Sequence, residues 1–325
     1  RRRIEIMKFS PWPSFEDDEI AAATAVLQKG QVNYWTGNEC RLFEQEFAER
    51  HGVARAIAVS NGSVAIGMAL RALQLPPNSE IIVTPRTFVA TVSEIVLAGH
   101  VPVFADVDRV SQNLTAESIA PLISDRTAAV VVVHLAGWPC DMRSIVRLAA
   151  EHNLCIVEDC AQAHGASIDD RPVGSWGDIA TFSYCQDKIM TTGGEGGMVV
   201  TDSEELWSTC WSFKDHGKST DLLTPVNATP VFRYVHDSIG TNFRMTEMQA
   251  AIGRVQLRKL SDWVERRRRN AAALAEALAG VDALRIPRPQ DDRIRHAYYK
   301  FYAFVRPDAL KAGWTRDRIV AEILD

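Results

Sequence analysis

Several short polar segments follow apolar stretches typical of strands and contain residues that could bind an anion. The first is Ser60-Asn61-Gly62-Ser63, which lies between an apolar run and a helix-forming stretch. A helix start with a glycine, free amide groups and hydroxyls is suited to phosphate. Asn and Ser are also ordinary helix caps, and taken alone this segment is better explained as a cap.

A second segment supplies a carboxylate. Asp159 comes just after the apolar stretch 154–157 and is followed by Gln162. An aspartate in this position could pair with a protonated pyridine nitrogen and keep such a ring an electron sink. A loop carboxylate that caps the next turn is an equally good interpretation of the residue by itself.

A third segment contains Lys188, in a polar loop that follows the stretch 181–183. A lysine sheltered near a bound phosphate can lose its proton and form a covalent bond with a carbonyl carbon. A single lysine usually has no such role. The run Gly193-Gly194-Glu195-Gly196-Gly197 favours one here, because its backbone freedom is costly unless a turn or a close approach needs it.

The fourth segment, residues 240–245, precedes a long helix-forming stretch and contains Asn242 and Arg244. Both side chains suit a phosphate or carboxylate, and both could equally be loop and cap residues.

The elements that must position these segments alternate between strand-like and helix-like from about residue 50 to 200. Continuously apolar strands separated by helices are typical of a sheet buried on both faces, so we expect a doubly wound, mostly parallel α/β sheet. In such sheets, ligands lie beyond the carboxyl ends of the strands. Strands are expected at 54–59, 80–83, 101–105, 128–133 and 154–157, and helices at 64–73, 87–98 and 141–152.

The C-terminal part predicts a helix over 246–279, a strand over 298–305 and a helix over 315–324. We therefore expect an N-terminal arm and large domain over 1–255 and a smaller α+β domain over 256–325, incomplete where the sequence ends. The arm, around residues 9–13, could embrace a partner subunit. The four arginines at 266–269 are best explained as a solvated helix face.

The composition excludes several classes of function. The 325 residues are 46% hydrophobic and 24% charged with a net charge of -5, so no basic field favours nucleic acid. No apolar run approaches the roughly 18–20 residues that span a bilayer, and residues 1–5 lack a secretory signal, so a cytoplasmic protein is expected. The six cysteines lack a Cys-x-x-Cys pair, which leaves a zinc site or a disulfide framework unsupported.

Together these segments closely resemble the DegT/StrS-type sugar aminotransferases. These are fold-type I enzymes, of the aspartate-aminotransferase fold, that use pyridoxal 5'-phosphate (PLP). The likeness runs from about residue 9 to the C-terminus in the family's order. It is carried by Lys188 and by residues 60–63, 84–91, 99–108, 133–137, 158–165, 182–184, 194–197, 240–244 and 249–253.

The resemblance implies a role for each matching residue. Lys188 matches the lysine that carries PLP as a Schiff base, and Asp159 the carboxylate at the pyridine nitrogen. Asn242 matches a phosphate contact from the neighbouring subunit, which implies a homodimer with its active site at the interface. The other cofactor contacts implied are Gln162 beside the phenolic oxygen, Phe88 stacked on the ring, and Gly62, Ser63 and Ser183 at the phosphate.

The family also implies L-glutamate as the amino donor and a nucleotide-linked keto-sugar as the acceptor. The product would be an amino sugar for a surface polysaccharide or a secondary metabolite. Four residues are candidates for the substrate mouth, although a structural role suits each equally well: Trp35, His164, His216 and Lys218.

Three alternatives remain. The stretch 9–30 bears some likeness to aminohydroxybenzoate synthases, which use the same cofactor. A PLP-dependent dehydratase is disfavoured, because such relatives replace the lysine with histidine. A non-catalytic PLP-binding regulator is disfavoured by the intact set of Asp159, Gln162 and Lys188 and by the lack of a DNA-reading motif.

Overall fold

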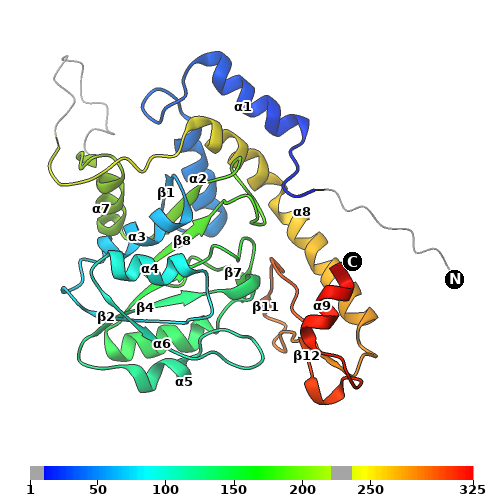
Figure 1. Ribbon diagram of the computed structural model, residues 1–325. Coiled ribbons are helices and arrows are strands. Elements are labelled where there is room, and N and C mark those ends of the chain that lie inside the picture. The colour runs from blue at the N-terminus through cyan, green and yellow to red at the C-terminus, as the bar shows by residue number, and fades with distance from the viewer. Residues whose placement is uncertain (1–10, 221–235, 325) are drawn as a thin grey trace, which may run out of the picture.

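A seven-stranded sheet forms the centre of the protein in a computed structural model, which describes residues 11–220 and 236–324 (Figure 1). The strand order is β1-β9-β8-β5-β4-β2-β3. Strand β9 is antiparallel to both of its neighbours, β1 and β8, and all other neighbouring strands are parallel. The strands are β1 Arg55–Val59, β2 Glu80–Val83, β3 Val101–Phe104, β4 Thr127–Val133, β5 Cys155–Asp159, β8 Ile179–Ser183 and β9 Gly197–Thr201. The predicted doubly wound, mostly parallel sheet is confirmed.

Helices cover both faces of this sheet (Figure 1). Because successive side chains of a strand point to opposite faces, Val131 of β4 joins one core cluster while Val130 and Val132 join the other. The first cluster includes α2 (Glu39–His51), α3 (Gly62–Ala72) and α7 (Glu204–Lys214), and the second includes α6 (Met142–His152). The predicted continuous apolar strands thus correspond to strands buried on both sides.

The remaining elements surround this core. The helices are α1 Asp17–Lys29, α4 Val89–Leu97, α5 Ala116–Ile119, α8 Glu247–Ala277 and α9 Arg316–Leu324, and the short strands are β6 Ser167–Ile168, β7 Arg171–Pro172, β10 Leu284–Arg285, β11 Ile294–Arg295 and β12 Phe304–Val305. Helix α8 begins with a capping box formed by Thr246 and Gln249. It continues across the expected domain boundary at 255/256, which therefore lies inside one helix. None of the described helices has the length and apolarity to cross a membrane.

Two expectations for the C-terminal part were only partly correct. Of the strand expected over 298–305, only β12 forms. Backbone bonds instead tie this segment to the loop after β4, since the amides of Ala297 and Lys300 donate to carbonyls of that loop. The arginine run is also not wholly solvated: Arg267 and Arg268 donate to the carbonyls of Tyr298 and His296.

Candidate active site

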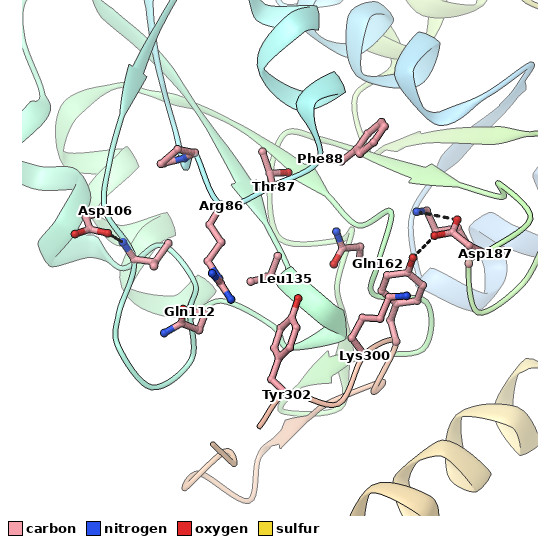
Figure 2. Close-up of a pocket in the computed structure, with 14 residues that line it drawn as sticks. Arg86, Thr87, Phe88, Asp106, Gln112, Leu135, Gln162, Asp187, Lys300 and Tyr302 are labelled. Carbon is pink, nitrogen blue, oxygen red and sulfur yellow. Dashed lines mark hydrogen bonds and ion pairs between the residues drawn. The ribbon is translucent and has the colours of Figure 1, made fainter. Parts of the chain in front are cut away.

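A cavity of about 780 Å³ opens at the carboxyl ends of the parallel strands, the edge where ligands were expected (Figure 2). Its walls come from the loops after β2, β3, β4, β5 and β8 and from the segment before β12. Of the sequence candidates, Phe88, Gln162 and Lys188 line it.

Asp159 is the last residue of β5 and is only 4% exposed. Its carboxylate accepts hydrogen bonds from the Thr91 hydroxyl at 2.8 Å and the Ala161 amide at 3.1 Å. Burial raises the pKa of Asp159, although both hydrogen bonds and the charge of Lys188 work to lower it. In the described part of the chain, no Lys, Arg or His forms an ion pair with this carboxylate. Asp159 is therefore a buried acceptor that can still bind a protonated nitrogen.

The neighbouring Glu158 fixes the position of Asp159. Its fully buried carboxylate accepts a bond from the His134 ring at 3.0 Å and bonds from the backbone amides of Gly174, Trp176 and Gly177. Burial works to raise the pKa of Glu158, but these partners outweigh it and hold the pKa below its usual value. His134, Glu158 and Cys160 have ligand atoms within 4.8 Å of one another, as a metal site would. The hydrogen bonds give His134 and Glu158 a structural role.

Lys188 lies in the loop after β8, where its amide donates to the carbonyl of Cys185. Its ammonium nitrogen is 3.3 Å from a carboxylate oxygen of Asp187 and 5.1 Å from the centroid of the Tyr299 ring. The Tyr299 hydroxyl donates to the other oxygen of Asp187. Burial works to raise the pKa of Asp187, but the Tyr299 hydroxyl and Lys188 together hold it below its usual value. The loop thus holds the lysine side chain at the cavity wall.

The start of α3 and the end of β8 form a close contact suited to phosphate. A Cβ added to Gly62 would lie 2.6 Å from the Cβ of Ser183, and one added to Gly197 would lie 2.4 Å from the carbonyl oxygen of Asn61. Only glycine permits these approaches. Asn61 caps α3, since its side chain accepts from the Val64 amide at 2.9 Å. The interpretation of this segment as a cap is therefore correct, and Gly62, Ser63 and Ser183 still lie together at a positive helix end.

Gln162 and Phe88 both line the cavity. The side-chain oxygen of Gln162 accepts from the Ala136 amide at 2.7 Å, which fixes the side chain at the cavity wall. Phe88 is the N-cap residue of α4 and is 68% exposed, so its ring is available to a ligand (Figure 2).

His164 does not lie at a substrate mouth, contrary to expectation. It is fully buried, its ring Nε2 lies 2.8 Å from the Ser183 carbonyl oxygen, and its ring stacks on Tyr184. Burial lowers the pKa of His164 to about 3, so the ring is neutral and donates this bond. His164 therefore fixes the backbone of Ser183 through this hydrogen bond, which is a structural role.

The other substrate candidates also lie away from the cavity of this single chain. Trp35 donates to a carboxylate oxygen of the buried Asp215 at 2.8 Å, and Lys218 and Arg244 pair with the other oxygen at 3.0 and 2.7 Å. Asn242 is exposed and pairs with Asp215 through the backbone, and His216 is exposed nearby. No pattern in the sequence indicated that Asp215 joins these residues.

Several cavity residues were missed by the sequence reasoning. Tyr299 and Tyr302 were assigned to a strand, and neither Asp187 nor the Thr91 contact of Asp159 was singled out as functional. Arg86 lay inside a stretch that carried the family resemblance but received no role.

Comparison with known proteins identifies the family. Residues 13–324 match the model of the DegT/DnrJ/EryC1/StrS aminotransferase family. The chain belongs to this family. It is 42% identical over 232 residues to GDP-perosamine synthase of Escherichia coli O157:H7, a match that covers 71% of this chain and 61% of the relative. It is 38% identical over 293 residues to UDP-N-acetyl-3-dehydro-alpha-D-glucosamine 3-aminotransferase of Acidithiobacillus ferrooxidans, covering 90% of this chain and 76% of the relative.

Solved structures agree with this assignment. An aminotransferase from Psychrobacter cryohalolentis superposes with a TM-score of 0.95 at 52% identity, covering 98% of this chain and 82% of that one. The E. coli GDP-4-keto-6-deoxy-D-mannose-3-dehydratase, solved with hydrated PLP, superposes with a TM-score of 0.87 at 26% identity, covering 98% of this chain and 84% of that one.

PLP is the cofactor of this family, and the residues of this chain fit it. Asp159 offers a buried carboxylate that no cation of the described chain pairs with. The start of α3, where Gly62 allows a close backbone approach, is a helix N-terminus suited to a phosphate. Lys188 lines the cavity.

Proposed function

We propose that the protein is a PLP-dependent aminotransferase that moves an amino group from L-glutamate to a nucleotide-linked keto-sugar. The amino sugar formed would serve a surface polysaccharide or a secondary metabolite. The observation that carries the proposal is the buried carboxylate of Asp159 at the end of β5, which lies close enough to Lys188 at the cavity wall for the charge of the lysine to act on its pKa. The relatives named for GDP-linked and UDP-linked sugars support the substrate class and leave the nucleotide open.

The bound cofactor supplies an electron sink next to the carbon that gains or loses the amino group. Asp159 would hold a proton at the pyridine nitrogen, because its carboxylate is buried and the bond from Thr91 orients it. Lys188, once its amine is released, would carry a proton between the substrate carbon and the cofactor carbon, a role worth roughly 10²–10⁴-fold in rate. Asp187 can receive the lysine ammonium at 3.3 Å, which keeps the amine near the reacting carbons. Gln162 would contact the phenolic oxygen, and Phe88 would cover one face of the ring.

A homodimer is part of the proposal. Asn242 lies on the surface of the chain, beside the group that surrounds Asp215, and not at its own cavity. The family resemblance implies that Asn242 makes its phosphate contact in the site of a second subunit, and its exposed position is compatible with this role. Trp35, His216 and Lys218 surround the same Asp215 or lie near it, so the dimer would also bring these substrate candidates to the partner's site.

The test is the visible absorption of the purified protein before and after addition of L-glutamate. The wild type should show the yellow absorption of lysine-bound PLP and lose it with glutamate. The Lys188→Ala variant should lack this absorption. The matched control Lys300→Ala removes another lysine of the same cavity wall and should keep it.

A colourless protein that takes up no added PLP would refute the proposal. Absorption that glutamate leaves unchanged would reject glutamate as the donor. A screen of GDP- and UDP-linked keto-sugars then identifies the acceptor, and product analysis separates an amino sugar from an aminohydroxybenzoate or a dehydrated sugar. Turnover of glutamate would by itself rule out the alternative of a non-catalytic regulator.

A further inference from the structure

Arg86 projects into the cavity from the loop after β2. Its backbone amide donates to the Thr84 hydroxyl at 3.0 Å, which fixes the turn that follows the strand. Figure 2 shows its side chain extending into the cavity beside Gln112, with Tyr302 below it. The guanidinium carbon lies 5.6 Å from the centroid of the Tyr302 ring. The side chain is therefore held against an aromatic ring inside the pocket and does not extend into open solvent.

The charge of Arg86 has no carboxylate partner in the described ranges, 11–220 and 236–324, and its Nε is buried without a hydrogen-bond partner. Two acidic residues line the same cavity. Asp106 accepts from the Val107 amide and is directed away from Arg86 in Figure 2, while Asp187 binds Lys188 and the Tyr299 hydroxyl.

Some other half-buried arginines are paired, while others in the described part of the chain, such as Arg285, rest on an aromatic ring without a carboxylate but lie outside the cavity. Arg254 binds Glu46 and Glu39, and Arg244 binds Asp215. A guanidinium held by an aromatic ring but lacking an anion has the donor geometry to bind a carboxylate or phosphate with two parallel hydrogen bonds. Arg86 thus has the features of a binding group whose partner comes from outside the chain.

We propose that Arg86 binds an anionic group of a substrate while the reacting carbon lies at Lys188. This inference rests on the proposed function. Arg86 and Asp187, the neighbour of Lys188, come from opposite sides of the cavity (Figure 2), so the anionic group is remote from the reacting carbon. Two sources carry such a group: the diphosphate of a nucleotide-linked sugar and a carboxylate of the amino donor.

The experiment compares wild type, Arg86→Gln and Arg86→Lys, all loaded with PLP. Arg109→Gln is the control, since it removes an exposed arginine from the nearby loop after β3 that does not line the cavity. Two quantities are measured: the L-glutamate concentration that removes half of the yellow absorption, and the dissociation constants of UDP and GDP by calorimetry. PLP content and melting temperature are recorded for each variant.

We expect Arg86→Gln to weaken one of these interactions at least tenfold, with PLP content unchanged. The affinities of Arg86→Lys should lie between those of the wild type and Arg86→Gln, because an ammonium keeps the charge but cannot form two parallel hydrogen bonds. If only the response to glutamate weakens, the partner of Arg86 is the donor carboxylate. If only the affinity for UDP or GDP weakens, the partner is the diphosphate. If both weaken, the two ligands use the same anion site at different steps of the reaction. If Arg86→Gln fails to fold, Arg86→Lys carries the test.

Unchanged values for both ligands, or equal losses in Arg109→Gln, would overturn the inference. Nucleotide binding does not require the amino-transfer reaction. If glutamate leaves the absorption of the wild type unchanged, this result counts against the proposed function. A nucleotide affinity that depends on Arg86 would still support the anion site.

Discussion

Gly62 offers the sharpest test of the phosphate site, because one methyl group there should disturb both folding and cofactor binding. In Gly62→Ala the new Cβ would lie 2.6 Å from the Cβ of Ser183 and 3.2 Å from its Cα. Real Cβ atoms do not approach other carbons so closely, so the start of α3 and the end of β8 must separate. Ser183 is itself held by the buried ring of His164, which leaves it little freedom to move.

The expected cost follows from the overpacked contact. Inserting a methyl group into a well-packed site costs about 1–3 kcal/mol, and we expect a loss of this size in the free energy of unfolding. Gly67→Ala, in the same helix, is the matched control. Its Cβ would meet the carboxylate end of Glu94 at 2.3 Å, but the tip of a flexible side chain can move away. Alanine also suits a helix interior better than glycine by roughly 0.5–1 kcal/mol, so this variant should be neutral or more stable.

The assay has two parts. Urea unfolding of the cofactor-free proteins gives the free energy of unfolding, and titration with PLP gives the cofactor affinity from the yellow absorption. Gly62→Ala should lose stability and bind PLP at least tenfold more weakly, while Gly67→Ala should change neither by much. Equal PLP affinity in Gly62→Ala and wild type would refute the assignment of this contact as the phosphate site.

Two further predictions concern buried ionisable groups. Glu158→Gln replaces an oxygen that accepts backbone hydrogen bonds with an NH₂ group that cannot accept them, so the free energy of unfolding should fall by about 2–4 kcal/mol; a loss below about 0.5 kcal/mol would contradict the network. Burial lowers the pKa of His51 to about 4 and of His164 and His296 to about 3, whereas an unfolded histidine titrates near 6.5. The unfolded chain then binds more protons below pH 6.5, so stability present at pH 7 should fall by up to about 2 kcal/mol per histidine by pH 5. Urea unfolding at pH 7, 6 and 5 measures this slope, and a gain in stability on acidification would contradict it.

The sheet was predictable because its strands are buried on both sides and therefore carry uninterrupted apolar runs. The stretch 128–133 illustrates this, since it lies within β4 and its valines contact both core clusters. The residues at or after the ends of these strands, including Asp159 and Lys188, could be found because strand ends are where such folds bind ligands. Their roles came from a family resemblance, since a capping carboxylate or an exposed lysine would have the same residue type at the same place.

The unpredicted features depend on contacts between distant segments. Tyr299 reaches the cavity because the backbone before β12 bonds to the loop after β4, more than 150 residues earlier in the sequence. A segment rich in aromatic and apolar residues, such as 298–305, has the local composition of a strand whether or not a partner strand exists. The burial of His164 could not be predicted for the same reason. A histidine after a strand has the same local sequence whether it faces solvent or, as here, is fully buried.

The strand ends around the cavity hold two charged groups that do not neutralise one another. Asp159 is a buried carboxylate without a cationic partner, and Arg86 a partly buried guanidinium without an anionic one, both among the residues that the structure describes. Burying a single charge is unfavourable, and a chain under selection for stability alone would pair such groups or replace them with apolar residues. Arg86 instead lines the cavity at the strand ends, and Asp159 ends strand β5, whose following loop contributes Gln162 to the cavity wall. Their separation is therefore best explained by two outside partners of opposite charge, a protonated ring nitrogen for Asp159 and an anionic substrate group for Arg86. The binding of each partner then compensates for the unfavourable free energy of burying the corresponding unpaired charge.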